Sequence, residues 1–288
     1  MHITLLSLVS SEGCSGDRVP VLACRDTLRA EGAEVSTVAA GSDDEIDSSF
    51  AEVGDGRRLV IAAATDGEVR AVLRRMVRRY APPPSKRPDD LPADRTVYDL
   101  PTVGVLPLDS RTPPDLVARL GLPRSPEDVA RTALGGSVRR LDLFRTDNGS
   151  VTLNGSLVGG ADQHGQATAW YGQVEVDDAI LTDGSEPLVA CAIANTPGYA
   201  TIDGLPLVAD ASPDDGLIEV GVAVPVVRRG LFRRKIRVEV RRSRGRAVSI
   251  TPRDDVPFLD DGVTGTLGRK RSWWIERGAW SVYSPLRA

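Results

Sequence analysis

Leu59–Leu73 reads LVIAAATDGEVRAVL and decides the fold. Its first half is an unbroken apolar run, as expected for a strand buried on both faces of a parallel sheet. In its second half, Val69, Val72 and Leu73 recur at helical spacing. The stretch therefore predicts a strand, a turn of small residues and a helix. Open α/β sheets bind ligands at the carboxyl ends of their strands, so the turn that carries Asp66 is a candidate site.

Composition narrows the class of protein. The chain has 288 residues, of which 41% are hydrophobic and 26% charged. This composition is typical of a soluble globular protein, and the length predicts two domains of medium size. The formal net charge of −4 gives no general attraction to nucleic acid. Three cysteines without metal-ligand spacing favour a reduced, cytoplasmic protein. No apolar run approaches the ~20 residues that span a bilayer.

Strands and helices alternate in the first half of the chain, which predicts a doubly wound α/β domain over residues 1–142. The expected strands are 3–9, 34–38, 59–64 and 102–108, and the expected helices are 18–30, 43–51, 66–79, 116–120 and 126–134. Residues 81–101 are rich in proline and charge, so we expect an exposed excursion too polar to pack. A lid and a tolerated surface insertion are both open interpretations of it.

From residue 143 onward the pattern changes to short alternating segments separated by turn residues. No long amphipathic helix interrupts them, which predicts an antiparallel β-sandwich domain over residues 143–288. Arg228–Arg246 is strongly basic, with Glu239 as its one acid. This hairpin could dock on an anionic membrane surface or could be a merely solvated strand pair.

A set of motifs follows in a fixed order through the chain. They are Asp66-Gly67, a Val-Gly-Val-Leu-Pro-Leu strand, a Leu-Gly-Leu-Pro break before a helix, a Leu-Asp-Leu strand, and a β domain with Pro-Asp-Asp-Gly-Leu-Ile-Glu-Val and a late Asp-Asp-Gly. In this order they resemble the catalytic domain of the diacylglycerol kinase family, which includes bacterial lipid kinases and sphingosine kinases and shares its fold with NAD kinases. The resemblance covers nearly the whole chain, most clearly 59–285.

The resemblance implies an ATP site at the turn, where the family has Gly-Gly-Asp-Gly-Thr. The matching residues here are Ala64, Thr65, Asp66, Gly67 and Glu68. The two leading glycines are replaced, and Glu68 adds a negative charge where a polyanion would lie. A second family motif, Pro-Leu-Gly-Thr-x-Asn-Asp, survives mainly in its last acid, Asp115.

The late family motif Asp-Gly-Glu supplies the acid that activates the acceptor hydroxyl. Here it is Asp261-Gly262-Val263, so the resemblance implies Asp261 as general base, whereas Val263 cannot replace a carboxylate. The family also holds a structural Mg²⁺ in an acidic turn, which implies Asp214, Asp215 and Glu219 as ligands. A plain Asp-Gly turn before a strand explains these residues equally well.

The resemblance thus implies ATP-Mg²⁺-dependent phosphoryl transfer to a lipid or other hydroxyl acceptor, with Asp66 and Asp261 as catalytic residues. The alternative is a catalytically degenerate relative that binds a nucleotide or lipid as a sensor or partner protein. The altered glycines favour the second hypothesis, and the retained acids favour the first. We expect no nucleic-acid partner, a cytoplasmic location with peripheral membrane contact left open, and a homodimer left open.

Overall fold

The computed structural model describes residues 1–9, 19–50, 53, 57–83, 86–109, 115–160, 168–202, 204–229 and 234–286. The chain divides into two compact units, which we call unit 1 (Met1–Leu141 with Arg277–Ala288) and unit 2 (Asp142–Glu276). The sequence predicts domains 1–142 and 143–288. The structure differs in the C-terminal segment, which belongs to unit 1 because Val282 pairs with Val103.

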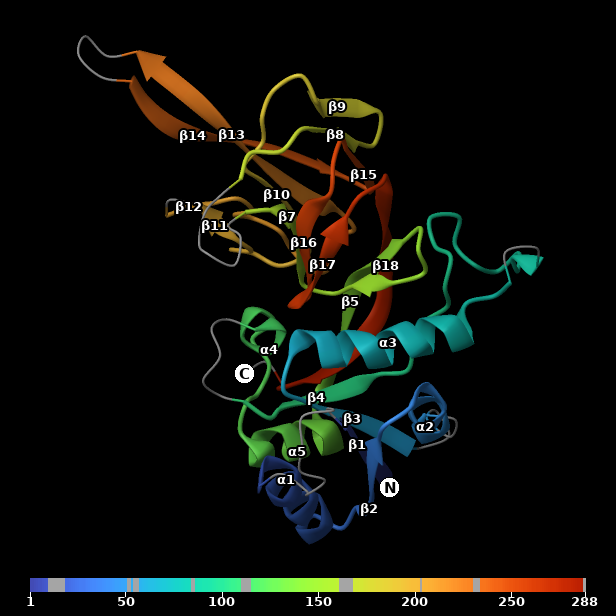
Figure 1. The fold of residues 1–288 in the computed structure, drawn as a ribbon. Coiled ribbons are helices and arrows are strands. Elements are labelled where there is room, and N and C mark those ends of the chain that lie inside the picture. Colours follow the sequence, from blue (N-terminus) through green and yellow to red (C-terminus); the bar gives the residue numbers. More distant parts are fainter. Residues whose placement is uncertain are drawn as a thin grey trace. The chain divides into compact units, whose positions relative to one another are not determined.

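Unit 1 alternates strands and helices (Figure 1). Its elements are β1 (His2–Leu8), α1 (Val19–Ala30), β2 (Glu34–Ala40), α2 (Asp43–Ser49), β3 (Arg57–Ala63), α3 (Asp66–Tyr80), β4 (Val103–Pro107), α4 (Leu116–Arg119) and α5 (Pro126–Gly135). The parallel strands lie in the order β2-β1-β3-β4, so the strand order reverses between β1 and β3. The turn after β3 therefore lies at the switch point of a doubly wound sheet.

Helices cover the sheet of unit 1 on both faces. Strand β3 is buried from Leu59 to Ala63, as its apolar run predicts. Helices α1 and α5 share a core with one sheet face, built from Ile3, Leu5, Val21, Cys24, Leu28, Val60, Ala62, Leu106, Val129, Ala130 and Ala133. Helix α3 lies on the other side of the sheet (Figure 1) and buries Val69, Val72, Leu73, Met76 and Val77. None of the helices in the described part of the chain is long and apolar enough to cross a membrane.

Unit 2 is built from strands. Its elements are β6 (Val151–Thr152), β7 (Gly155–Gly159), β8 (Gly172–Val176), β9 (Ala179–Asp183), β10 (Ala190–Ala194), β11 (Thr201–Ile202), β12 (Leu205–Pro206), β13 (Ile218–Arg229), β14 (Arg234–Gly245), β15 (Ala247–Pro252), β16 (Val256–Asp260) and β17 (Val263–Leu267). Two further strands, β5 (Ser137–Thr146) and β18 (Arg271–Ser284), begin in one unit and end in the other.

The strands of unit 2 form two antiparallel layers. One sheet has the order β14-β13-β10-β7-β16-β17, and the second contains β18-β15-β8-β9. Side chains from both contribute to one buried core, which includes Val158, Cys191, Ile193, Val220 and Val222 from the first and Val174, Val176, Val248, Ile250 and Trp273 from the second. The alternation in the sequence therefore reflects inward and outward faces of packed sheets.

The proline-rich segment between α3 and β4 is packed, which corrects the expectation that it is too polar to pack. Leu91, Val97 and Leu100 are only 5%, 0% and 4% exposed. The Arg87 guanidinium donates hydrogen bonds to three main-chain carbonyl groups of the segment, which stabilises its compact conformation. Its apolar residues are spaced irregularly, so the sequence carries no periodic signal of their burial.

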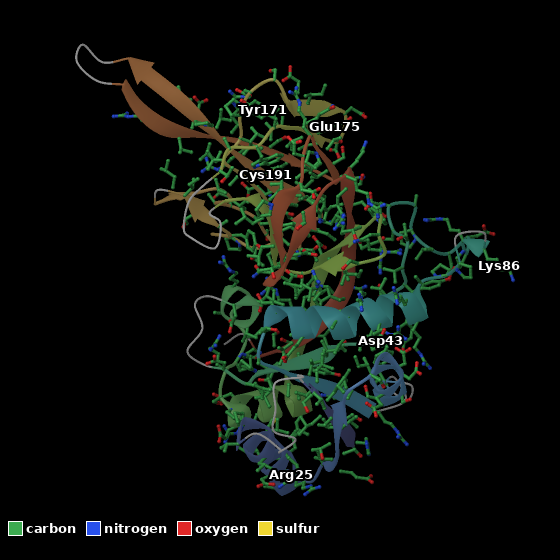
Figure 2. The ribbon with its side chains drawn as sticks, in the orientation of Figure 1. Arg25, Asp43, Lys86, Tyr171, Glu175 and Cys191 are labelled. Atoms are coloured by element: carbon green, nitrogen blue, oxygen red, sulfur yellow. The ribbon has the colours of Figure 1, made fainter. Side chains whose placement is uncertain are left out.

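Two buried cysteines give a pH-dependent stability. Burial raises the pKa of Cys191, in the core of unit 2 (Figure 2), to about 12. Burial, reinforced by the charge of Glu127, raises the pKa of Cys24 to about 12 as well. Because each native pKa lies above the unfolded value, the stabilisation is fully present below about pH 9 and is lost as the pH rises toward 12.

We therefore expect the free energy of unfolding to fall above pH 9 by up to about 1.4 kcal/mol per pH unit for each of these thiols. Urea unfolding curves recorded from pH 8 to pH 11 measure this slope. The Cys191→Ala variant should show a shallower slope than the parent chain. Equal slopes for the two proteins would contradict the assignment to Cys191.

Candidate functional site

In the turn between β3 and α3, a main-chain N–H is bonded to a side chain of α3. Thr65 caps α3, and its hydroxyl oxygen accepts a hydrogen bond from the Glu68 N–H at 3.3 Å. The Glu68 carboxylate turns back and accepts from the Ala64 N–H at 2.7 Å. This is a capping box in which the carboxylate reaches one residue before the cap. The Ala64 N–H, just before the N-terminus of α3, is therefore already occupied by a carboxylate.

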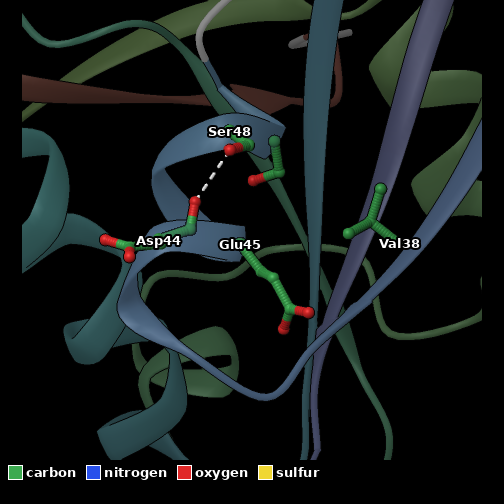
Figure 3. A pocket seen from close by; sticks show the side chains of 5 residues that line it. Val38, Asp44, Glu45 and Ser48 are labelled. Carbon is green, nitrogen blue, oxygen red and sulfur yellow. Dashed lines mark hydrogen bonds between the residues drawn. The ribbon is translucent and has the colours of Figure 1, made fainter.

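Helix α2 begins in the same way, which explains the closure of the turn as ordinary helix capping. Ser42 accepts from the Glu45 N–H at 3.3 Å, and the Glu45 carboxylate accepts from the Gly41 N–H at 2.6 Å. An open pocket of about 320 Å³ lies beside α2 and is lined by Val38, Asp44, Glu45, Ser48 and Ser49. Figure 3 shows the side chains that line it. None of the residues predicted for the functional site lines this pocket.

Asp66 and Asp115 meet at the beginning of α4. Both carboxylate oxygens of Asp66 accept from the Leu116 N–H, at 3.0 and 3.1 Å. Asp115 caps α4 through the Ala118 N–H at 2.8 Å and pairs with Arg124 at 2.7 Å. The structure thus brings together the predicted cofactor-binding residues of unit 1, and it engages their carboxylates with backbone groups and an arginine. The loop 110–114 and the early turn 10–17 lie outside the described residues.

Asp261 is buried in unit 2 and holds the chain at the start of β7. Its carboxylate accepts from three successive main-chain N–H groups, those of Leu153, Asn154 and Gly155, at 2.8, 2.9 and 3.1 Å. Its own N–H donates to the Gly155 carbonyl at 3.0 Å, and its φ is +47°. Carboxylate oxygens engaged in this way are less available to take a proton from a substrate hydroxyl.

A buried polar network surrounds Asp261. Asp260 accepts from the hydroxyls of Thr152 and Ser156, each at 2.7 Å. Asn195 donates to the carbonyls of Asp142 and Leu153, at 2.8 and 3.2 Å. These side chains are buried at the ends of neighbouring strands, where only the three-dimensional pairing brings them together.

The acidic turn before β13 gives each predicted metal ligand a different partner. Asp214 accepts from the Ser212 hydroxyl at 2.7 Å, and Asp215 accepts from the Leu217 N–H at 2.9 Å and pairs with Arg244. Glu219 accepts from the Asp210 N–H at 3.1 Å, and burial raises its pKa. No group of three or more His, Cys, Asp or Glu within the described ranges is arranged to hold a metal ion. The Mg²⁺ site stays a prediction, and a plain turn accounts for these contacts.

The basic hairpin is partly engaged within unit 2. Arg241 pairs with Glu186, Arg244 pairs with Asp215, and Arg242 donates to the Leu207 carbonyl at 3.1 Å. Residues 230–233, between β13 and β14 in the sequence, lie outside the described part of the chain. Docking on an anionic surface through Arg228–Arg246 therefore stays a prediction.

Known structures share this fold. The chain is similar to a solved structure described as a diacylglycerol kinase from Bacillus anthracis str. Sterne, with a TM-score of 0.65 and 12% identity. Two more, described as proposed diacylglycerol kinases from the same organism, have TM-scores of 0.68 and 0.67 at 12% and 13% identity. Each similarity covers 98% of this chain and 96% of the other. No protein-family model and no curated protein sequence matches the chain. The likeness is therefore one of fold, a mixed α/β fold with large sheets.

Proposed function

We propose that this chain is a lipid-binding protein of the diacylglycerol kinase fold that does not transfer phosphate from ATP. One observation carries the proposal: the Glu68 carboxylate occupies the Ala64 N–H at 2.7 Å. A phosphate brought to this turn would meet a carboxylate where it requires a donor. Like charges roughly 4 Å apart repel by ~1 kcal/mol in water and ~4 kcal/mol at an effective dielectric constant of about 20.

The acids of the predicted catalytic set support the same proposal. Asp66 receives the first N–H of α4, and Asp115 caps that helix. Asp261 accepts three main-chain N–H groups. In each case the carboxylate satisfies backbone donors that would otherwise be unpaired at a helix end or in a buried turn. These acids then act as structural residues, and their retention does not require a kinase reaction.

The ligand class that we propose comes from the fold. The solved structures that share it are described as diacylglycerol kinases, and a chain that has lost the phosphoryl donor can retain the acceptor. We therefore propose a lipid alcohol as the ligand. A role as a sensor or partner protein, a cytoplasmic location and a homodimer are parts of this proposal.

A second candidate function is ATP-Mg²⁺-dependent phosphoryl transfer to a lipid alcohol. The position of Asp66, at the switch point of a parallel sheet, favours it. The arrangement of the described residues does not fit the two cofactors, because the Ala64 N–H is occupied and no cluster of metal-ligating side chains is present among them. We derive no phosphoryl-transfer step from this arrangement.

The two functions differ in their response to ATP. We expect no thermal shift of the purified protein with millimolar ATP-Mg²⁺, with ADP or with Mg²⁺ alone. A ligand at about 100 times its Kd would stabilise the protein by about 2.7 kcal/mol and shift the melting temperature by several degrees. A shift with ATP-Mg²⁺ that Asp66→Asn abolishes would overturn the proposal and support the kinase.

Lipid binding is tested separately. We expect co-sedimentation with neutral phosphatidylcholine vesicles that contain diacylglycerol, and none with vesicles that lack it. Neutral vesicles exclude attraction through the basic hairpin, because that attraction requires anionic lipid. Failure to bind diacylglycerol, together with the absence of an ATP shift, would show that the ligand class is wrong.

A further inference from the structure

Two strands connect the units. The chain leaves unit 1 between Leu141 and Asp142, within β5, and returns between Glu276 and Arg277, within β18. These two segments are the covalent connections between the units. The contacts just inside unit 1, next to both crossing points, therefore decide how freely the strands bend.

Gly278 lies two residues beyond the return point and has a left-handed backbone with φ of +57°. Glycine adopts this conformation without steric cost, and in a strand it marks a bulge or bend. The Gly278 carbonyl accepts two hydrogen bonds from Arg140, from Nε at 3.2 Å and from Nη2 at 2.9 Å. Since Arg140 is the residue before Leu141, one side chain ties together the two connecting strands at their exit from unit 1.

Asp99, at the end of the proline-rich segment, holds that arginine in place. It forms ion pairs with Arg140 and with Arg95, the latter at 2.6 Å. The hydrogen bond from Arg140, helped by that from Arg95, lowers the pKa of Asp99 below its usual value, although partial burial opposes the shift. Asp99 is consequently an anion at neutral pH and can bridge the two guanidinium groups.

Arg95 anchors the cluster in the body of unit 1. It is 9% exposed, and its Nε and Nη2 have no hydrogen-bond partner among the described residues. Its main-chain carbonyl accepts from Arg87 at 2.7 Å. A buried guanidinium that depends on one carboxylate is strongly destabilised when that carboxylate is removed. Loss of the Asp99 charge should therefore strongly destabilise the contacts among Arg95, Asp99 and Arg140.

Between Asp99 and β4, the chain is hydrogen-bonded to β18. The Leu100 N–H donates to the Ala279 carbonyl at 2.8 Å. Two residues further on, the Thr102 and Ser281 hydroxyls lie 2.8 Å apart. The end of the proline-rich segment and Thr102, which follows it, are thus hydrogen-bonded to the part of β18 that lies between Gly278 and Val282.

We propose that Arg95, Asp99 and Arg140 form a clamp on β5 and β18, and that opening of this clamp sets how freely the two connecting strands bend. The clamp gives the proline-rich segment a role in the fold, because this segment then connects the core of unit 1 to the connecting strands β5 and β18. It goes beyond the proposed function, because it concerns the connection between the units whatever ligand they bind.

The test compares amide hydrogen exchange in the full-length chain and in Asp99→Asn. This variant keeps the size of the side chain and removes the charge that both arginines require. We expect exchange in peptides covering 276–281 and 138–142 to become about tenfold faster. Exchange in α1 and α5, on the far face of the unit 1 sheet, should not change.

A matched control is Asp26→Asn, which removes an aspartate that pairs with Arg25 on α1. It should leave exchange at 276–281 as in the parent chain. Arg140→Gln should reproduce the effect of Asp99→Asn, and the double variant should add nothing to it. Unchanged exchange at 276–281 in Asp99→Asn would overturn the clamp, as would a uniform increase throughout unit 1 or an equal increase in Asp26→Asn.

Discussion

Asp261→Ala lowers the free energy of unfolding by about 3 kcal/mol or more. The substitution leaves three buried main-chain N–H groups, those of Leu153, Asn154 and Gly155, without their acceptor. A buried donor left unsatisfied costs about 1–3 kcal/mol. Alanine also tolerates the φ of +47° less well than aspartate does. Guanidinium unfolding monitored by tryptophan fluorescence measures the loss.

Two variants make this result specific. Asp261→Asn retains a side-chain oxygen as acceptor and a residue suited to the left-handed backbone, so it should lose much less stability. Asp254→Ala, at an exposed aspartate just before β16, should be close to neutral. If Asp261→Ala were as stable as the parent chain and had lost a kinase activity, Asp261 would be a general base and the structural assignment would be wrong.

Restoring the family pattern at the turn should create ATP affinity. The variant that combines Ala64→Gly, Thr65→Gly and Glu68→Thr removes the carboxylate from the Ala64 N–H and two Cβ atoms from the approach to it. With a repulsion of ~1 to ~4 kcal/mol removed, we expect ATP-Mg²⁺ to bind at least about fivefold more tightly. Isothermal titration calorimetry with ATP-Mg²⁺ measures the change.

Helix α2 supplies the matched control for this prediction. Glu45→Thr removes the same carboxylate from the same kind of capping box, so its effect on helix stability should be similar. Its ATP affinity should stay at the level of the parent chain. Equal ATP affinity for all three proteins would show that the turn has lost its phosphate site for reasons other than Glu68.

The sequence predicts most elements of the fold. The helix predicted over residues 126–134 is α5, and its N-cap Ser125 accepts from the Asp128 N–H at 3.1 Å. Strands β16 and β17 carry no clear strand signal in the sequence. The first contains a proline, and the second is exposed at four of its five positions, so neither shows the alternation that reveals a half-buried strand.

The candidate site was predictable only in part. The Thr65-x-x-Glu68 spacing fits a capping box, so the sequence carried a signal that Glu68 turns inward. The environment of Asp261 carried no such signal, because its backbone donors lie more than 100 residues earlier in the chain. Local patterns identify a residue and its neighbours, whereas a buried carboxylate acquires its role from distant chain segments. The site assignments therefore stay predictions until the variants above are measured.

The return of the chain to unit 1 through β18 has a consequence for biosynthesis. Unit 2 is complete at Glu276, whereas the sheet of unit 1 receives the pairing of Val282 with Val103 only when the later residues have been made. Chains emerge from the ribosome amino end first. The strands of unit 2 can therefore fold before unit 1 has received its last strand. A nascent chain that has emerged from the ribosome only as far as Glu276 would therefore carry a complete unit 2 and an open unit 1 sheet, with the edge of β4 exposed.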